Sequence, residues 1–166
     1  MRKRKELAED IVGQLARRHS TAVVMFHHAV AERLGLGPTD HKCLDLLRDR
    51  GPMTGSELSA ITGLTSGAIT GVVARLERAG YVRREQDPND GRKQTLSAAR
   101  KGAHIQDVIN PLREDVAASL ENFDNDQLAA IAEFLTRTTE FIYRHAALLR
   151  AHTLAVTLGG TQAGSR

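Results

Sequence analysis

Residues 53–97, MTGSELSAITGLTSGAITGVVARLERAGYVRREQDPNDGRKQTLS, decide the fold. The TGSE run at 54–57 is a capping box, in which the threonine hydroxyl and the glutamate carboxylate each accept a backbone N–H at the start of a helix. Gly63 ends this helix with the residue that best tolerates a positive φ, and Thr65 or Ser66 can cap the next one. Two helices joined by so short a turn predict a helix-turn-helix.

The second of these helices has an apolar side and a side of small residues. The apolar stripe consists of Ile69, Val72, Val73 and Leu76, whose spacing places them on one helical face. The other side carries Ser66, Gly67, Thr70, Gly71, Ala74 and Arg75. Because most of these side chains are small, a groove can accept this face, and its hydroxyls can bond phosphates or base edges.

A basic hairpin follows the second helix. Ala79 and Gly80 stop that helix, residues 81–85 are expected to form a strand, and the DPNDG run at 87–91 is expected to turn the chain into a returning strand over 92–96. Helix, turn, helix and hairpin in this order predict a winged helix-turn-helix. The fold class is mainly α with a small β-hairpin wing.

The same residues resemble the MarR family of bacterial transcriptional regulators over nearly the whole chain. The most specific element is the DPNDGR run at 87–92 followed by Leu96 and Ser97, which is similar to the wing signature of that family. The runs LGLGPTD at 34–40 and LERAGYV at 76–82 also resemble family elements. The resemblance implies a transcriptional regulator that binds double-stranded DNA.

The resemblance also implies one MarR-like domain over residues 1–156. Its winged helix-turn-helix is expected at about 38–97, between dimerisation helices at about 5–35 and 98–150. Apolar residues recur at helical spacing along both flanks, and a winged helix can bury its own small core, so the flanking helices are expected to pair in a homodimer. Two-fold symmetry then places two recognition helices about 34–36 Å apart on a near-palindromic operator.

Two features interrupt the helical pattern after the wing. Pro111 removes one backbone N–H and clashes with the preceding turn, so a kink or a break is expected there. Residues 157–166, TLGGTQAGSR, have no apolar period and are predicted to be a disordered tail.

Composition agrees with this interpretation. A chain of 166 residues with 4% aromatic content fits a single helical domain. No apolar run approaches the roughly 18 residues of a membrane span, and no signal peptide is recognisable, so the chain is expected to be cytoplasmic with no membrane partner. Its single cysteine excludes an internal disulfide.

The charge is modest overall but uneven along the chain. The formal net charge is +3, whereas residues 65–101 carry eight basic and four acidic side chains. Beside a helix-turn-helix this local excess suits a DNA phosphate backbone. For Arg83 and Arg84 alone, a solvated charged surface remains the alternative.

Candidate DNA contacts come from the recognition helix and the wing. Arg92 at the hairpin tip can enter a narrow minor groove, and Asp90 can hold its guanidinium or make only an Asx-turn. Ser66 can contact DNA or only cap the helix. Many relatives carry an arginine near Gly71, so specificity here is expected to rest more on shape and on 65–70. The predicted set is Thr65, Ser66, Gly67, Thr70, Arg75, Arg83, Arg84, Asp90, Arg92 and Lys93.

A small-molecule effector is implied by the resemblance alone. In relatives such molecules bind between the dimerisation helices and the DNA-binding lobe, which here would include Phe26, Val30, His41 and Leu44. The histidines lack His-x₃-His spacing, so neither a metal nor another cofactor is predicted. Cys43 is in phase with apolar neighbours and is predicted to be a buried hydrophobe, not a redox sensor.

Three functions are compatible with these residues to different degrees. A ligand-responsive homodimeric repressor, which is not an enzyme, fits the helix order, the wing and the charge. A winged-helix module that binds another protein is the alternative, supported by Gly71 and the weakly basic recognition helix. A hydrolase or nuclease would depend on Asp87 and Asp90, with no second acid, histidine or nucleophile at usable spacing.

Overall fold

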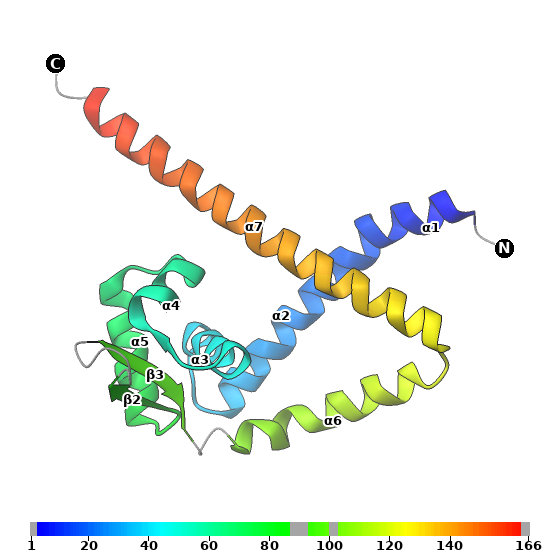
Figure 1. Cartoon of the computed structure of the whole chain (residues 1–166), viewed down its shortest axis with the longest axis horizontal. Coiled ribbons are helices and arrows are strands. Elements are labelled where there is room, and N and C mark those ends of the chain that lie inside the picture. Colours follow the sequence, from blue (N-terminus) through cyan, green and yellow to red (C-terminus); the bar gives the residue numbers. More distant parts are fainter. Residues whose placement is uncertain (1–2, 87–92, 100–102, 164–166) are drawn as a thin grey trace. The chain divides into compact units, whose positions relative to one another are not determined.

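A computed structural model describes residues 3–86, 93–99 and 103–163. The chain divides into two compact units, Met1–Asn110 and Pro111–Arg166. The first unit holds the winged helix and the helices that precede it, and the second holds most of the long C-terminal helices. Figure 1 shows the order of these elements along the chain.

The first unit begins with a long helical segment. It consists of α1 (Arg4–Asp10), a π-helical stretch η1 (Ile11–Leu15) and α2 (Ala16–Arg33), which follow one another without a loop where the helix over 5–35 was expected. Gly35, at φ 68°, closes this segment in a conformation that favours glycine. Helix α3 (Pro38–Arg50) then starts with proline at a first-turn position, where a missing N–H costs little.

The helix-turn-helix is formed by α4 (Gly55–Thr62) and α5 (Ser66–Arg78). The capping box is present: Thr54 N donates to Glu57 Oε2 at 2.7 Å, and Glu57 N donates to Thr54 Oγ1 at 3.2 Å. Gly63 ends α4 at φ 75°. The two helices are bent by 113° at this turn, within the usual range for the motif.

The wing belongs to a three-stranded antiparallel sheet of order β1-β3-β2. Strands β2 (Val82–Gln86) and β3 (Gln94–Ala98) pair from Val82 opposite Ala98 to Gln86 opposite Gln94. The additional strand β1 (Met53–Thr54) pairs with Leu96 and Thr95. It was not predicted, because two residues are too short to show an alternating pattern.

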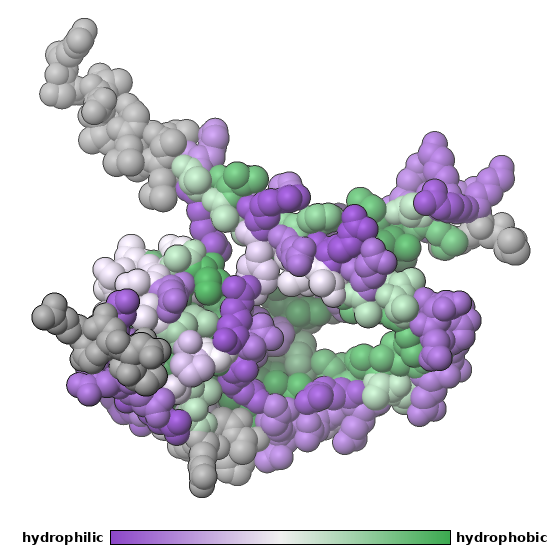
Figure 2. Space-filling view, viewed as in Figure 1, coloured by the Kyte–Doolittle hydropathy of each residue, from purple (hydrophilic) through white to green (hydrophobic). Residues whose placement is uncertain are grey.

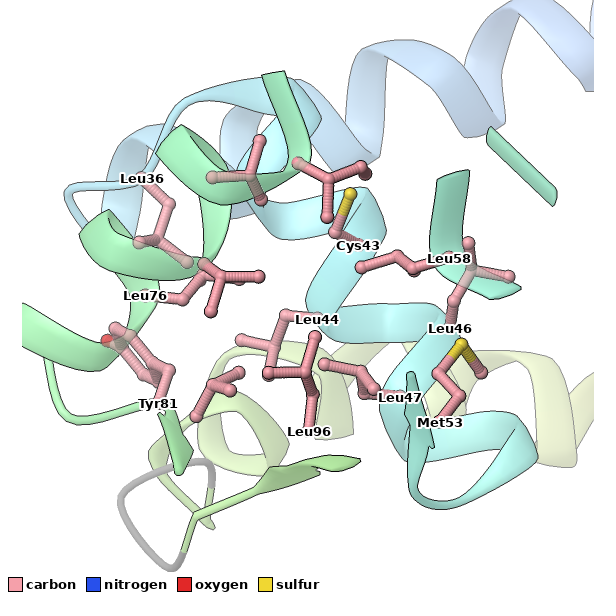
Figure 3. Close-up of a cluster of buried hydrophobic side chains, with 14 of the residues drawn as sticks. Leu36, Cys43, Leu44, Leu46, Leu47, Met53, Leu58, Leu76, Tyr81 and Leu96 are labelled. Carbon is pink, nitrogen blue, oxygen red and sulfur yellow. The ribbon is translucent and has the colours of Figure 1, made fainter. Parts of the chain in front are cut away.

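A hydrophobic core fills the winged helix, with side chains from α3, α4, α5 and the sheet (Figure 3). The predicted apolar stripe of α5 is confirmed, because all four of its residues are at most 3% exposed. Leu44 of α3 and Leu58 of α4 are also fully buried. Cys43 is 0% exposed, as expected of a buried hydrophobe. Burial raises the pKa of its thiol to about 11.

The C-terminal helices are α6 (Ala103–Leu120) and α7 (Asn125–Ala163). Helix α6 runs through Pro111 without interruption, so the prediction of a break at this residue is wrong. The helix can continue because the loss of one backbone N–H leaves the neighbouring turns hydrogen-bonded. Helix α7 starts at an Asp124–Gln127 capping pair. It continues to Ala163, into the predicted disordered tail, because extending a formed helix adds one hydrogen bond per residue.

Within the part of the chain that the structure describes, no single helix is long and apolar enough to cross a membrane, although α4 and α5 together meet the criteria for a bent span.

Candidate nucleic-acid interface

The N-terminal end of α5 presents small polar residues. Ser66, Gly67 and Thr70 are exposed, whereas Ile69 between them is buried. The Thr65 hydroxyl accepts the N–H of Ala68 at 3.2 Å, so Thr65 is the cap and a purely capping role for Ser66 is excluded. The positive end of a helix dipole lies at this terminus, where phosphate is favoured.

A groove of about 780 Å³ lies beside this end of α5. It is lined by β1, by the first turns of α4 and α5, and by the residues that enter β3. Its polar lining includes Thr54, Ser56, Glu57, Ser66, Thr70 and Lys93. Two predicted contacts on the recognition helix therefore lie in one groove with one predicted contact from the wing. The Thr70 hydroxyl donates to the Ser66 carbonyl at 2.9 Å, which leaves its oxygen able to accept a further bond.

Arg75 forms a bidentate salt bridge with Asp40 of α3. Its Nε and Nη2 donate to the two carboxylate oxygens of Asp40 at 2.8 and 2.7 Å. Asp40 is 4% exposed, and its hydrogen bond raises the pKa of the Arg75 guanidinium. The Arg75 side chain remains 53% exposed. Arg75 therefore positions α5 against α3, a role in addition to the DNA contact predicted for it.

The Asp40–Arg75 pair also lies beside position 71. A Cβ added to Gly71 would lie 3.4 Å from Arg75 Nη1, which is an ordinary van der Waals contact. Sequence reasoning missed Asp40 because its partner is 35 residues away, and no local pattern links the two.

The arginines of β2 are also ion-paired within the chain. Arg84 Nε lies 2.9 Å from Glu77 Oε1 and thereby links the wing to α5. Arg83 Nε lies 2.7 Å from Glu85 Oε1. The Ser97 hydroxyl donates to Glu85 and is the main reason that the pKa of this carboxyl is lowered. Both arginine side chains are still at least 40% exposed, so an outward contact with phosphate remains sterically open.

The predicted wing-tip contacts Asp90 and Arg92 lie outside the described residues. Lys93, the first described residue after them, is exposed.

The residues predicted to contact an effector lie on α2 and α3. Val30, His41 and Leu44 are each at most 2% exposed, and Phe26 is half-buried. Three of these four side chains therefore lie inside the protein and not at its surface. Phe26 is the one through which this region reaches the surface.

Comparison with known proteins gives a consistent result. A family model described as MarR family matches residues 36–93. The chain is 42% identical over 142 residues to the HTH-type transcriptional regulator YcgE of Bacillus subtilis, an uncharacterised protein, and the match covers 84% of this chain and 90% of YcgE.

Two solved structures share the fold. A MarR family protein from Bacillus stearothermophilus has a TM-score of 0.63 at 23% identity, over 86% of this chain and 99% of that one. Bordetella bronchiseptica BpsR, whose DNA binding is regulated by 6-hydroxynicotinic acid, has a TM-score of 0.50 at 22% identity, over 79% and 94%.

Proposed function

Because this chain belongs to the MarR family of helix-turn-helix transcriptional regulators, we propose that it represses transcription by binding a near-palindromic DNA operator as a homodimer. The exposed end of α5, where Ser66 and Thr70 border the groove that also contains Lys93, carries this proposal. Small side chains let the helix approach base edges in a major groove. The helix terminus and the basic wing supply attraction to the phosphates.

The proposed base and backbone contacts follow from this arrangement. Ser66, Gly67 and Thr70 face the bases, and Thr65 sets the start of the helix. Lys93, Arg83, Arg84 and, by its place in the sequence, Arg92 meet phosphates or the minor groove. Arg75 acts mainly by holding α5 to Asp40, which keeps the reading face in register.

The homodimer is supported by apolar side chains that face solvent on the long helices (Figure 2). On α7, Phe134, Phe141 and Leu148 recur at intervals of seven residues and are 42–59% exposed. An apolar strip of this kind marks an interaction surface, and a second copy of the chain supplies an identical strip under two-fold symmetry. The dimer then positions two copies of α5 on one operator.

We further infer that a small molecule regulates DNA binding. BpsR, which shares the fold, is regulated by a small aromatic acid. In this chain Phe26 of α2 packs against His27, whose ring lies 5.4 Å from that of His41 on α3. The neighbouring Asp40 of α3 holds Arg75 of α5. A ligand that separates α2 from α3 beside Phe26 would therefore move the recognition helix.

The direct test measures binding to a labelled fragment of the gene's own upstream DNA. An unrelated duplex of equal length serves as the control, and both are measured at two salt concentrations. Tight binding to the upstream fragment, weakened by salt and absent on the control, supports the proposal. Equal weak binding to both duplexes would favour the protein-interaction module instead.

A further inference from the structure

Two histidines and one carboxylate converge between α2 and α3. His27 comes from α2, and His41 and Asp45 come from α3. One ligand atom from each side chain lies within 4.8 Å of the other two. His41 and Asp45 are four residues apart, so they share one helical face, and the packing of α2 brings His27 to that face. The rings of His27 and His41 have centroids 5.4 Å apart.

His27 carries a polar atom that the protein itself does not satisfy. Its Nδ1 is buried and has no hydrogen-bond partner among the residues that the structure describes. A buried nitrogen without a partner is destabilising, and such atoms are few in native proteins. The neighbouring Phe26 packs against the ring at a centroid distance of 5.8 Å and offers no acceptor. A ligand that accepts the nitrogen lone pair would remove this cost.

We propose that His27, His41 and Asp45 bind a divalent transition-metal ion, with Zn²⁺ as the best fit. Two imidazole nitrogens and one carboxylate oxygen are a common donor set for zinc. Ca²⁺ and Mg²⁺ are disfavoured because they prefer oxygen ligands throughout. Three protein ligands leave a fourth position for water or an added ligand.

The charge state of the site suits metal binding. Burial lowers the pKa of both His27 and His41, which favours the neutral imidazole that a metal ion requires. The Asp45 carboxylate would offset part of the charge of the ion. Its present contact is with Lys42, whose Nζ lies 3.2 Å from Asp45 Oδ2.

The three ligand atoms, which lie within 4.8 Å of one another, need to move only slightly closer together to bind zinc. Zinc bonds of about 2.0–2.1 Å in a tetrahedron place ligand atoms roughly 3.3 Å apart. The Asp45 side chain is 33% exposed and the Lys42 side chain is 54% exposed, so the carboxylate can leave the lysine and turn inward without repacking the core. Lys42 therefore competes with the metal for Asp45.

The site adjoins the contact that holds the recognition helix. His41 follows Asp40, whose carboxylate binds Arg75 of α5. An effect of the metal on operator binding would follow from this neighbourhood and rests on the proposed function. The test below uses no DNA, so the metal site and the proposed function fail separately.

The experiment titrates Zn²⁺ into the tag-free full-length protein by calorimetry and records the visible spectrum with Co²⁺. We expect one ion per chain and a tetrahedral cobalt spectrum. His27→Gln should weaken Zn²⁺ binding by at least about tenfold, since even loss of an outer-shell partner costs 10- to 100-fold. Asp45→Asn should weaken it as well, whereas Lys42→Ala should tighten it by removing the competing cation.

His28→Gln is the matched control, because His28 is the exposed neighbour of His27 on the same helix. It should bind Zn²⁺ as the wild type does. Helical circular dichroism checks that each variant is folded. The proposal is overturned if the wild type shows no saturable binding at micromolar Zn²⁺, or if His27→Gln and His28→Gln bind equally well.

Discussion

The winged helix and the long flanking helices differ in the burial of their apolar side chains. Among the described residues, every buried hydrophobic side chain lies between Val30 and Ile105. The exposed large hydrophobic ones lie at 7–25 and 112–149. The winged helix thus closes its own core, while the flanks keep apolar faces in solvent. The winged helix therefore buries its apolar side chains by itself. The flanking helices could bury theirs only against another surface.

The largest expected effect is on the core of the winged helix. Leu58→Ala removes a side chain that is 0% exposed, so the free energy of unfolding should fall by about 2–5 kcal/mol. Urea denaturation measures it. The control Gln14→Ala, at an exposed polar side chain of η1, should change the same quantity by no more than about 0.5 kcal/mol. Equal losses would mean that the two regions do not differ in packing.

A second prediction addresses the flanks. Phe141→Glu places a charge in the exposed apolar strip of α7 and should raise the dimer dissociation constant at least tenfold, or about 1.4 kcal/mol. Sedimentation equilibrium measures this constant. Thr139→Glu adds the same charge at an exposed position of α7 off this strip and should leave the dimer intact. An unchanged dimer in Phe141→Glu would mean that this strip is not the interface.

The parts of the fold that depend on near neighbours could be predicted from the sequence. Thr54 and Glu57 are three residues apart, and Gly63 ends its helix by its own backbone preference. Asp40–Arg75 and the His27–His41–Asp45 cluster could not be predicted, because each is created by the packing of different helices. The strand β1 is a third case, since its two residues pair with Leu96 and Thr95 of β3, which are distant in the sequence.

The third prediction distinguishes residues that bind the operator from residues that form the dimer. Arg92→Ala should weaken operator binding by about 1–3 kcal/mol if Arg92 supplies minor-groove contacts. The dimer should remain, because the change lies in the wing and not on the long helices. Fluorescence anisotropy on the upstream fragment measures the affinity. Arg137→Ala, which removes an exposed arginine from α7, is the control and should bind the operator normally. Unchanged affinity in Arg92→Ala would remove this residue from the interface.

The smallest expected effect is on the salt dependence of binding. Lys93 is exposed and lines the groove beside Ser66 and Thr70. If it meets one phosphate, Lys93→Ala should lower the slope of log affinity against log salt by about 0.9. The loss should be similar on operator and unrelated DNA, because a phosphate contact carries no sequence information. A loss of affinity for the operator alone would instead mean that Lys93 contacts bases. The surface that recognises the DNA sequence would then extend from α5 into the wing.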